Sequence, residues 1–543
     1  MATRQQASLG LSSSSSPQSK LAKLAGKCPD YVEYSKYPHK PIEPGDYNYP
    51  FMRPPPKCRT FSSPAVERVI DDLKAKVLSP DLGRLIENCL PNTLDTTILW
   101  HTDKSAQDGS PHTFVVTGDI HAEWLRDAAR QLAVYQPFVK HDPKLARLMV
   151  GAIHTQAFYI NVSPYCNAFH PPPGSGIHKG NTAKDNVFPP PNWNQVFECK
   201  YEIDSLASFL TLSNDYYENL GGDTLFMDPL WWQAFEKVLV VIKRESVPLF
   251  DEESGRALKH YYSFKRWTDI GLETLPLGGV GNPVNFGTGL VRLAFRPSDD
   301  ATILQFFIPG NIHAVTELKR TRKNLLKQEN LGAAKSDFAV IKRVVDELIK
   351  NISEGLDTYG IIDHPAYGKV YAYEVDGYGG AVFMDDANIP SLLAMPDMGF
   401  VPVDDPVYQN TRKMILRKEG NPYYLTGAFF EGIGGPHVGI QNAWPMSLLV
   451  KIRTSQDDKE ISEALELVMK LTAGLGLMHE TVNVNSPGGR DYTRLWFAWC
   501  NSEFGKTILW LAKHKPHLIF KDGVGSYDID KALRLVNQAN DIE

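Results

Sequence analysis

Apolar residues recur every three or four positions along most of this chain, which is the period of a helix with one buried face. In the first such run Val66, Val69, Ile70, Leu73 and Val77 share one side. Segments of this kind recur down to the C-terminal end, and the strand-like pieces between them are short. Predicted helices lie near 64–78, 82–90, 121–138, 143–160, 203–219, 229–246, 309–329, 334–355, 387–398, 406–419, 442–453, 457–474, 499–514 and 528–538.

Three of these helices carry the same start signal, an aspartate followed by proline. The pairs are Asp142-Pro143, Asp228-Pro229 and Asp405-Pro406. An aspartate at the N-cap accepts free backbone N–H groups, and proline suits the first helical position because that N–H has no partner within the helix. Each pair therefore predicts where a helix begins.

The segments between the helices are long and rich in Gly, Pro and Asn, and most clusters of acidic and aromatic residues lie in them. Long loops in a compact domain are usually functional. The simplest architecture is therefore all-α: helices paired in a double ring, with the loops of one end lining a central cleft. The loops span 164–195, 271–289, 359–383, 420–441 and 481–491.

The first 60 residues differ from the rest, because they combine a serine run with many prolines. This composition predicts a flexible tail followed by an extended arm over 1–60, and a single catalytic domain over 61–543. The start has no apolar core of the length that a secretory signal requires, so the chain as given is expected in the cytoplasm. Two glycosylation sequons, at Asn161 and Asn351, leave a secretory route open.

Composition restricts the function classes. The 543 residues are 43% hydrophobic, which is enough for a large core, and the net charge of -6 leaves no basic face for nucleic acid. No uninterrupted apolar stretch of about 18 residues occurs, so no membrane span is expected. The six cysteines lack the spacing of a zinc site and are interpreted as buried thiols, among which one or two bridges could form.

Two acidic motifs stand out from this background. Phe295 to Asp300 reads FRPSDD, and Met478-His479-Glu480 follows a glycine-rich apolar stretch. Hydrolysis of a glycosidic bond needs one carboxylic acid and one carboxylate, usually from distant segments. Asp299 and Asp300 should repel each other and raise at least one pKa, as a general acid requires, although an aspartate that caps the next segment is an equal alternative.

Other acids have similar surroundings and similar alternatives. Asp119 and Asp127 flank Trp124 and Arg126, where Arg126-Asp127 could equally be a structural ion pair. For the Asp385-Asp386 pair, helix capping and ligand contact are equally supported.

Several common catalytic motifs are absent. A zinc-protease motif would need histidine where Asn483 stands, and neither a phosphate-binding loop, a dinucleotide fingerprint nor a Gly-x-Ser-x-Gly elbow occurs. No cofactor and no metal is therefore expected.

Taken together, the motifs resemble glycoside hydrolase family 125. They are TGDI at 117–120, WLRD at 124–127, YEIDSL at 201–206, FRPSDD at 295–300, YEVDG at 373–377, MDD at 384–386, PSLLA at 390–394 and MHE at 478–480.

The resemblance implies an (α/α)6 barrel and a metal-independent, exo-acting α-mannosidase that removes α-1,6-linked mannose with inversion, with Asp299 as general acid and Glu480 as general base. It implies a mannose-containing oligosaccharide or N-glycan as substrate. The residues expected to bind it are Asp119, Trp124, Arg126, Asp127, Asp204, Arg296, Asp300, Asp385, Asp386, Asn388, His437, Trp444 and Arg494.

The chain departs from the usual family pattern at His121, Arg292 and Gln441-Asn442, and its loop from His170 to Trp193 is longer. The catalytic block is unchanged, so these departures concern contacts to a second sugar and the linkage preference rather than the reaction. Two alternatives stay open: another inverting hydrolase of the glucosidase or trehalase type, and a sugar-binding toroid without turnover.

Overall fold

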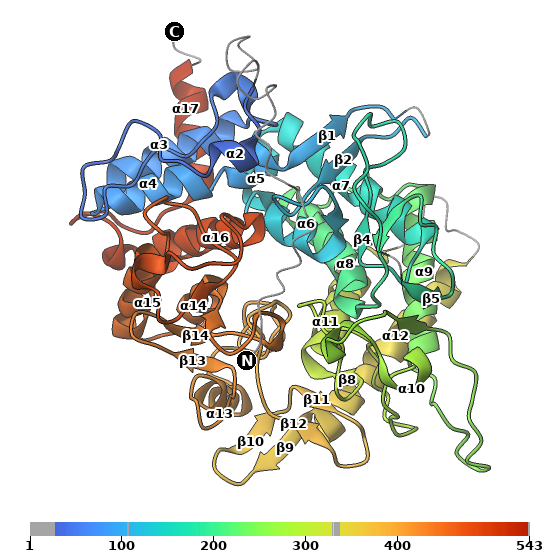
Figure 1. Ribbon diagram of the computed structural model, residues 1–543. Coiled ribbons are helices and arrows are strands. Elements are labelled where there is room, and N and C mark those ends of the chain that lie inside the picture. The colour runs from blue at the N-terminus through green and yellow to red at the C-terminus, as the bar shows by residue number, and fades with distance from the viewer. Residues whose placement is uncertain (1–27, 106–107, 184, 328–329, 331–336, 541–543) are drawn as a thin grey trace.

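The computed structural model describes residues 28–105, 108–183, 185–327, 330 and 337–540, and it is dominated by helices (Figure 1). Consecutive segments follow one another around the molecule, and the last helices return beside the first. The helices are α2 (Tyr31–Tyr34), α3 (Pro64–Lys76), α4 (Pro80–Cys89), α5 (Asn92–Thr96), α6 (Leu125–Ala133), α7 (Pro143–Val162), α8 (Ile203–Asn219), α9 (Pro229–Glu245), α10 (Pro276–Gly279), α11 (Ile308–Asn324), α12 (Phe338–Gly355), α13 (Pro406–Ile415), α14 (Pro445–Arg453), α15 (Asp458–Lys470), α16 (Ala498–His514) and α17 (Ile529–Asn540).

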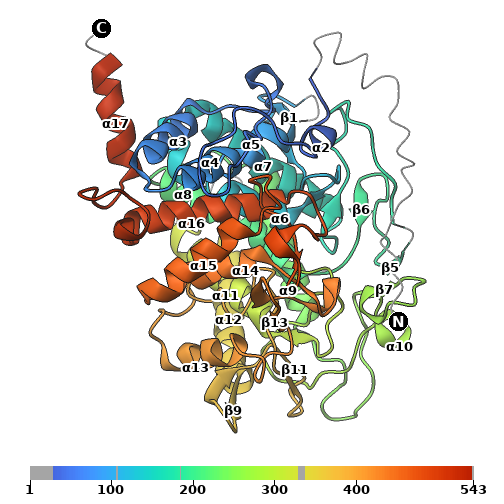
Figure 2. The same ribbon diagram turned by 60° about the vertical axis from the view of Figure 1, so that its left-hand side comes forward.

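The ring is closed by its two ends. Helix α16 packs on α4, α5, α6 and α14, and α17 packs on α3 (Figures 1 and 2). Helices α6, α8 and α11 contact one another in series. These helices, with α14 and α16, are buried almost throughout, whereas α12, α13 and α15 bury one face only. An inner and an outer layer of helices therefore form, as the all-α double ring predicts.

The strands are short and antiparallel, in sheets of two or three. They are β1 (Ile98–Thr102), β2 (His112–Val115), β3 (Glu123–Trp124), β4 (Ala168–Phe169), β5 (Asn186–Phe188), β6 (Val196–Glu198), β7 (Ser263–Lys265), β8 (Phe306–Phe307), β9 (Ile361–His364), β10 (Gly368–Tyr371), β11 (Glu374–Val375), β12 (Ala381–Val382), β13 (Tyr424–Thr426), β14 (Glu431–Ile433), β15 (Asn442–Ala443) and β16 (Val482–Asn483).

The predicted start signals are confirmed. Asp142 accepts the N–H groups of Lys144 and Leu145, and the carboxylates of Asp228 and Asp405 each accept an N–H three residues on. Each aspartate precedes a proline at the first helical position. The sequence therefore predicted the N-terminal ends of α7, α9 and α13 correctly.

One predicted helix, 387–398, is wrong, because the segment forms buried turns instead. The Asp385 carboxylate accepts the N–H groups of Leu392 and Leu393, and Asp386 accepts that of Asn388. Backbone donors that a helix would use internally thus go to side chains. Pro390 contributes no N–H and disfavours helical geometry at the residue before it.

Helix boundaries also shift. The segment predicted at 121–138 begins as a strand, β3, and becomes helical only at Leu125. The segment predicted at 334–355 is helical from Phe338, and residues 334–336 lie outside the described residues.

The described part of the arm, 28–60, is docked on the body. Met52 is fully buried and its N–H donates to Asn88, while Arg53 pairs with Asp95 at 2.7 Å. Residues 1–27 lie outside the described residues.

The cysteines divide into two bridges and two thiols. Disulfides join Cys28 to Cys58 and Cys166 to Cys199, and the described residues leave Cys89 and Cys500 free and buried. Of the sequon asparagines, Asn351 is exposed on α12, whereas Asn161 is half-buried and donates to Leu230 O. No helix within the described ranges is long and apolar enough to cross a membrane.

Candidate active site

A cavity of about 430 Å³, counting the space open to solvent, lies where the inner helices and their loops meet. Asp299 and Glu480, which are far apart in the sequence, both line it. The lining residues are Thr117, Ile120, Trp124, Arg126, Asp127, Pro297, Ser298, Asp299, Asn388, His437, Trp444, Glu480, Arg494, Phe497 and Trp499.

Asp299 occupies a tight turn in the FRPSDD loop. Its N–H donates to Arg296 O, and the N–H of Arg296 donates to Asp300 O. The φ angle of Asp299 is 65°, a left-handed conformation that is unfavourable for a residue with a Cβ atom. Such strain persists only where surrounding contacts hold it, and it is concentrated at functional sites.

Arg126 is the centre of the charges around Asp299. Its guanidinium lies 2.5 Å from Glu202, 3.2 Å from both Asp127 and Asp204, and 3.4 Å from Asp299. All of these side chains except Asp299 are almost completely buried. One guanidinium thus faces four carboxyl groups, and such a cluster is stable only if protons or further cations reduce its negative charge.

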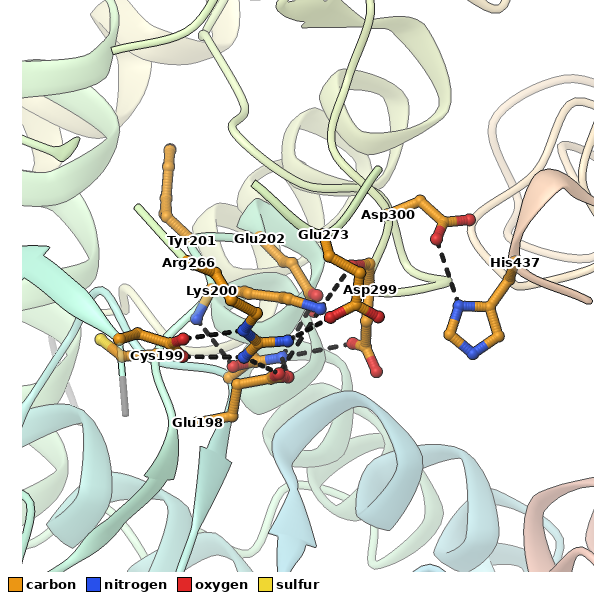
Figure 3. Close-up of polar contacts among 12 residues, drawn as sticks. Glu198, Cys199, Lys200, Tyr201, Glu202, Arg266, Glu273, Asp299, Asp300 and His437 are labelled. Carbon is orange, nitrogen blue, oxygen red and sulfur yellow. Dashed lines mark hydrogen bonds and ion pairs between the residues drawn. The ribbon is translucent and has the colours of Figure 1, made fainter. Parts of the chain in front are cut away.

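Asp299 does not have the raised pKa that the adjacent aspartates predict. Burial acts to raise it, but Arg126, Lys200 and a hydrogen bond from Glu202 outweigh burial and lower the pKa of Asp299 to about 2. Burial instead raises the pKa of Glu202 well above its usual value. Burial also raises the pKa of Asp127 to about 7. The cations that reverse the expectation come from other segments of the chain, and Figure 3 shows one of them, Lys200, beside Asp299.

Glu480, the second acid that lines the cavity, is held by residues from its own segment and the one that follows it. Its carboxylate accepts from the Thr493 hydroxyl at 2.7 Å and from Arg494 Nε at 3.1 Å, and Arg494 also pairs with Asp119. The neighbouring His479 stacks on Tyr492, and burial lowers its pKa to about 4, so it is neutral near pH 7. These contacts fix the Glu480 carboxyl group beside the Arg494 guanidinium.

His437 and Asn388 line the cavity, and each contacts the carboxyl group of an aspartate that does not line it. His437 Nδ1 lies 3.1 Å from Asp300 (Figure 3), and Asn388 donates to Asp386 at 2.8 Å. Burial would lower the pKa of His437, but the Asp300 carboxylate raises it to about 9. The cavity therefore presents an imidazolium near neutral pH.

Several polar atoms near the cavity lack a hydrogen-bond partner among the described residues. They include the indole N–H groups of Trp124 and Trp444 and the hydroxyl of Thr117, and all three residues are buried cavity-lining residues. Buried polar groups in proteins are normally paired, so these three atoms are exceptions beside the cavity. The indole faces would cover the apolar side of a ligand in the cavity.

The structure brings nine of the expected site residues to the cavity wall: Trp124, Arg126, Asp127, Asp299, Asn388, His437, Trp444, Glu480 and Arg494. The other six do not line the cavity. Asp119, Asp204, Asp300 and Asp386 each contact a lining side chain. Arg296 is buried against Glu374 at 2.6 Å, and Asp385 accepts backbone N–H groups. Both acids of the Asp385-Asp386 pair therefore accept backbone N–H groups.

Sequence reasoning missed the aromatic pair Phe497 and Trp499, which line the cavity, and two residues that hold Asp299, Asn167 and Lys200. Both aromatics lie within three residues of Arg494-Leu495-Trp496, which was a usable signal. Nothing in the local sequence marks Asn167 or Lys200.

Within the described residues, no group of three or more His, Cys, Asp or Glu side chains is placed to hold a metal ion. The acids around Arg126 are occupied by its guanidinium instead.

Comparison with known proteins gives three consistent matches. The model of glycoside hydrolase family 125, metal-independent alpha-mannosidases, matches residues 79–509. The chain is 50% identical over 496 residues to the meiotically up-regulated gene 157 protein of Schizosaccharomyces pombe, a match covering 91% of this chain and 94% of that protein. It is similar to the structure of a metal-independent alpha mannosidase of Streptococcus pneumoniae in a non-productive complex with alpha-1,6-mannobiose. That match has a TM-score of 0.72 and 32% identity, and it covers 83% of this chain and 99% of the other.

Proposed function

Because this chain belongs to glycoside hydrolase family 125, the metal-independent α-mannosidases, we propose that it removes terminal α-1,6-linked mannose from oligosaccharides with inversion of configuration. Asp299 is the general acid and Glu480 the general base. The observation that carries this proposal is that these two carboxyl groups, from segments some 180 residues apart in the sequence, line one cavity.

The surroundings of Glu480 suit a base. Thr493 and Arg494 hold the carboxylate, which lines the cavity. In an inverting reaction Glu480 removes a proton from water as the oxygen attacks the anomeric carbon. The bond from this carbon to the leaving oxygen breaks on the opposite face.

Asp299 has to deliver a proton to that leaving oxygen, although its own pKa is low. Glu202 supplies the missing proton, because its side chain is hydrogen-bonded to Asp299 and burial keeps it protonated. The two carboxyl groups then titrate as a pair that holds one proton. As the leaving oxygen gains negative charge, Asp299 gives up a proton and receives one from Glu202, and the ionised pair is reprotonated after product release.

The sugar and its linkage rest on similarity. The Streptococcus pneumoniae protein is in a non-productive substrate complex with alpha-1,6-mannobiose, and Trp124 and Trp444 line the cavity of this chain. Phe497 and Trp499 add apolar wall beside them.

The test is incubation with α-1,6-, α-1,3- and α-1,2-linked mannobioses in the presence of a chelator, with the product anomer followed by NMR. We expect β-mannose from the 1,6-linked substrate as the first product and no effect of the chelator. An aryl α-glucoside cleaved faster than the matching mannoside would favour the glucosidase alternative, and no hydrolysis of any substrate would favour a binding protein.

A further inference from the structure

Three residues from three different segments hold Asp299. Arg126 and Asn167 donate to its carboxylate at 3.4 and 3.2 Å, and Lys200 Nζ donates to its backbone carbonyl at 2.7 Å. Lys200 is buried and carries no sequence signal of function. The conformation of Asp299 is strained, so these contacts decide where its carboxyl group lies.

The three segments meet at one end of a small sheet. In the antiparallel order β3-β4-β6, Trp124 pairs with Ala168, and Ala168 pairs with Glu198. The end of β3, the start of β4 and the end of β6 therefore lie side by side. Arg126 follows β3, Asn167 precedes β4, and Lys200 follows β6. All three residues therefore lie at the same end of the sheet.

The Cys166–Cys199 disulfide links two of these segments at this end of the sheet. Cys166 directly precedes Asn167, and Cys199 directly precedes Lys200. The two segments are joined again by the Lys200 N–H, which donates to Asn167 Oδ1 at 3.0 Å. The carbonyl of Asn167 accepts the N–H of Leu125, beside Arg126. Figure 3 shows Cys199, Lys200 and Glu202 on one segment next to Asp299.

We propose that Asn167, Lys200 and the Cys166–Cys199 disulfide form a positioning unit that fixes the general acid, so that the bridge is required for turnover rather than for folding alone. This inference rests on the proposed function, since it assigns the unit to the acid of that reaction. The bridge holds the start of β4 and the end of β6 together. At this spacing Asn167 and Lys200, which each follow one of the two cysteines, both reach Asp299.

Glu198 supports the same positioning unit by contacting Lys200. Its carboxylate lies 3.4 Å from Lys200 and 2.7 Å from Arg266, which also pairs with Asp185 at 2.7 Å. Lys200 is thus held between Glu198 and the carbonyl of Asp299. A small shift of the β6 end would move the lysine away from the acid, and misplacement by about 1 Å can slow an enzyme roughly 100-fold.

The test compares two double variants, Cys166→Ala/Cys199→Ala and Cys28→Ala/Cys58→Ala. The second removes a disulfide of the arm and serves as the matched control. We expect the first to lower kcat at least tenfold with KM changed less than threefold, and the control to keep both constants. Equal kcat in wild type and the first variant, or six reactive thiols in denatured wild-type protein, would overturn the proposal.

A second pair of variants keeps the disulfide intact. Lys200→Met removes a cation beside the Asp299 and Glu202 pair, so the proton on that pair should be held more tightly. The alkaline limb of the kcat profile should then shift by about one pH unit to higher pH, and Lys200→Arg should restore it. A purely structural lysine would leave this limb unmoved, which would contradict the assignment. If wild-type protein cleaves no α-mannoside at all, the proposed function fails instead, so the two failures are distinguishable.

Discussion

Arg126 Nη1 lies 2.5 Å from Glu202 Oε2, and both side chains are buried almost completely. This contact links Glu202 to Asp299, because the same guanidinium also contacts the Asp299 carboxylate. Without the guanidinium, four carboxyl groups would face one another away from water.

We therefore expect Arg126→Met to destabilise the protein by about 3–5 kcal/mol, the usual cost of breaking a buried pair. Urea unfolding followed by circular dichroism measures this cost. The double variant Arg126→Met/Asp204→Asn should recover part of it, because Asp204 lies 3.2 Å from the guanidinium and a buried carboxyl group is then removed together with its partner. A double variant no more stable than the single one would contradict this account of the cluster.

Substrates with different leaving groups distinguish the general acid Asp299 from the general base Glu480. Asp299→Asn should reduce hydrolysis of α-1,6-mannobiose by about 10³-fold or more, but spare dinitrophenyl α-mannoside, whose leaving oxygen needs no proton. Glu480→Gln should impair both substrates alike, since water must still be activated. Steady-state kinetics on the two substrates measures the contrast, with thermal unfolding as the control for folding. The reverse pattern would exchange the roles.

Much of the fold could be predicted because helical periodicity is a local property. Asp142-Pro143 marks a helix start whatever surrounds it, and the structure confirms it. The segment 387–398 has helix-like apolar spacing, yet it fails because its N–H donors are taken by Asp385 and Asp386. Competition between a side-chain acceptor and the helix is decided by tertiary position, which periodicity does not contain.

The site also contains residues that local motifs predict and residues that only the tertiary structure identifies. Asp299 and Glu480 lie in recognisable motifs, and the structure places both at one cavity. The low pKa of Asp299 was not predictable from Asp300 beside it, because Lys200 and Arg126 approach from other segments. Asn167 shows the limit most clearly, since only the pairing of β4 with β6 brings it to the acid.

Arg296 offers a test of support against substrate contact. It is 1% exposed, lies 2.6 Å from Glu374 and stacks over Tyr373, and it does not line the cavity. Arg296→Met should therefore destabilise the protein by about 3–5 kcal/mol while KM for α-1,6-mannobiose changes less than twofold. Denaturant unfolding and initial rates measure the two effects. A large rise in KM at unchanged stability would instead place Arg296 on the sugar.

The His437–Asp300 pair predicts how stability changes with pH. The pKa of His437 is about 9 in the folded protein and about 6.5 when unfolded, so folding favours the proton. The stabilisation is complete below about pH 6.5 and is lost as pH rises through 9. The difference in melting temperature between wild type and His437→Gln should therefore be larger at pH 6 than at pH 10. As a control, His517→Gln breaks an exposed pair with Asp458 and should have little effect at either pH, because surface pairs stabilise weakly. A His437→Gln difference that is constant from pH 6 to 10 would show that the imidazolium is not what Asp300 stabilises.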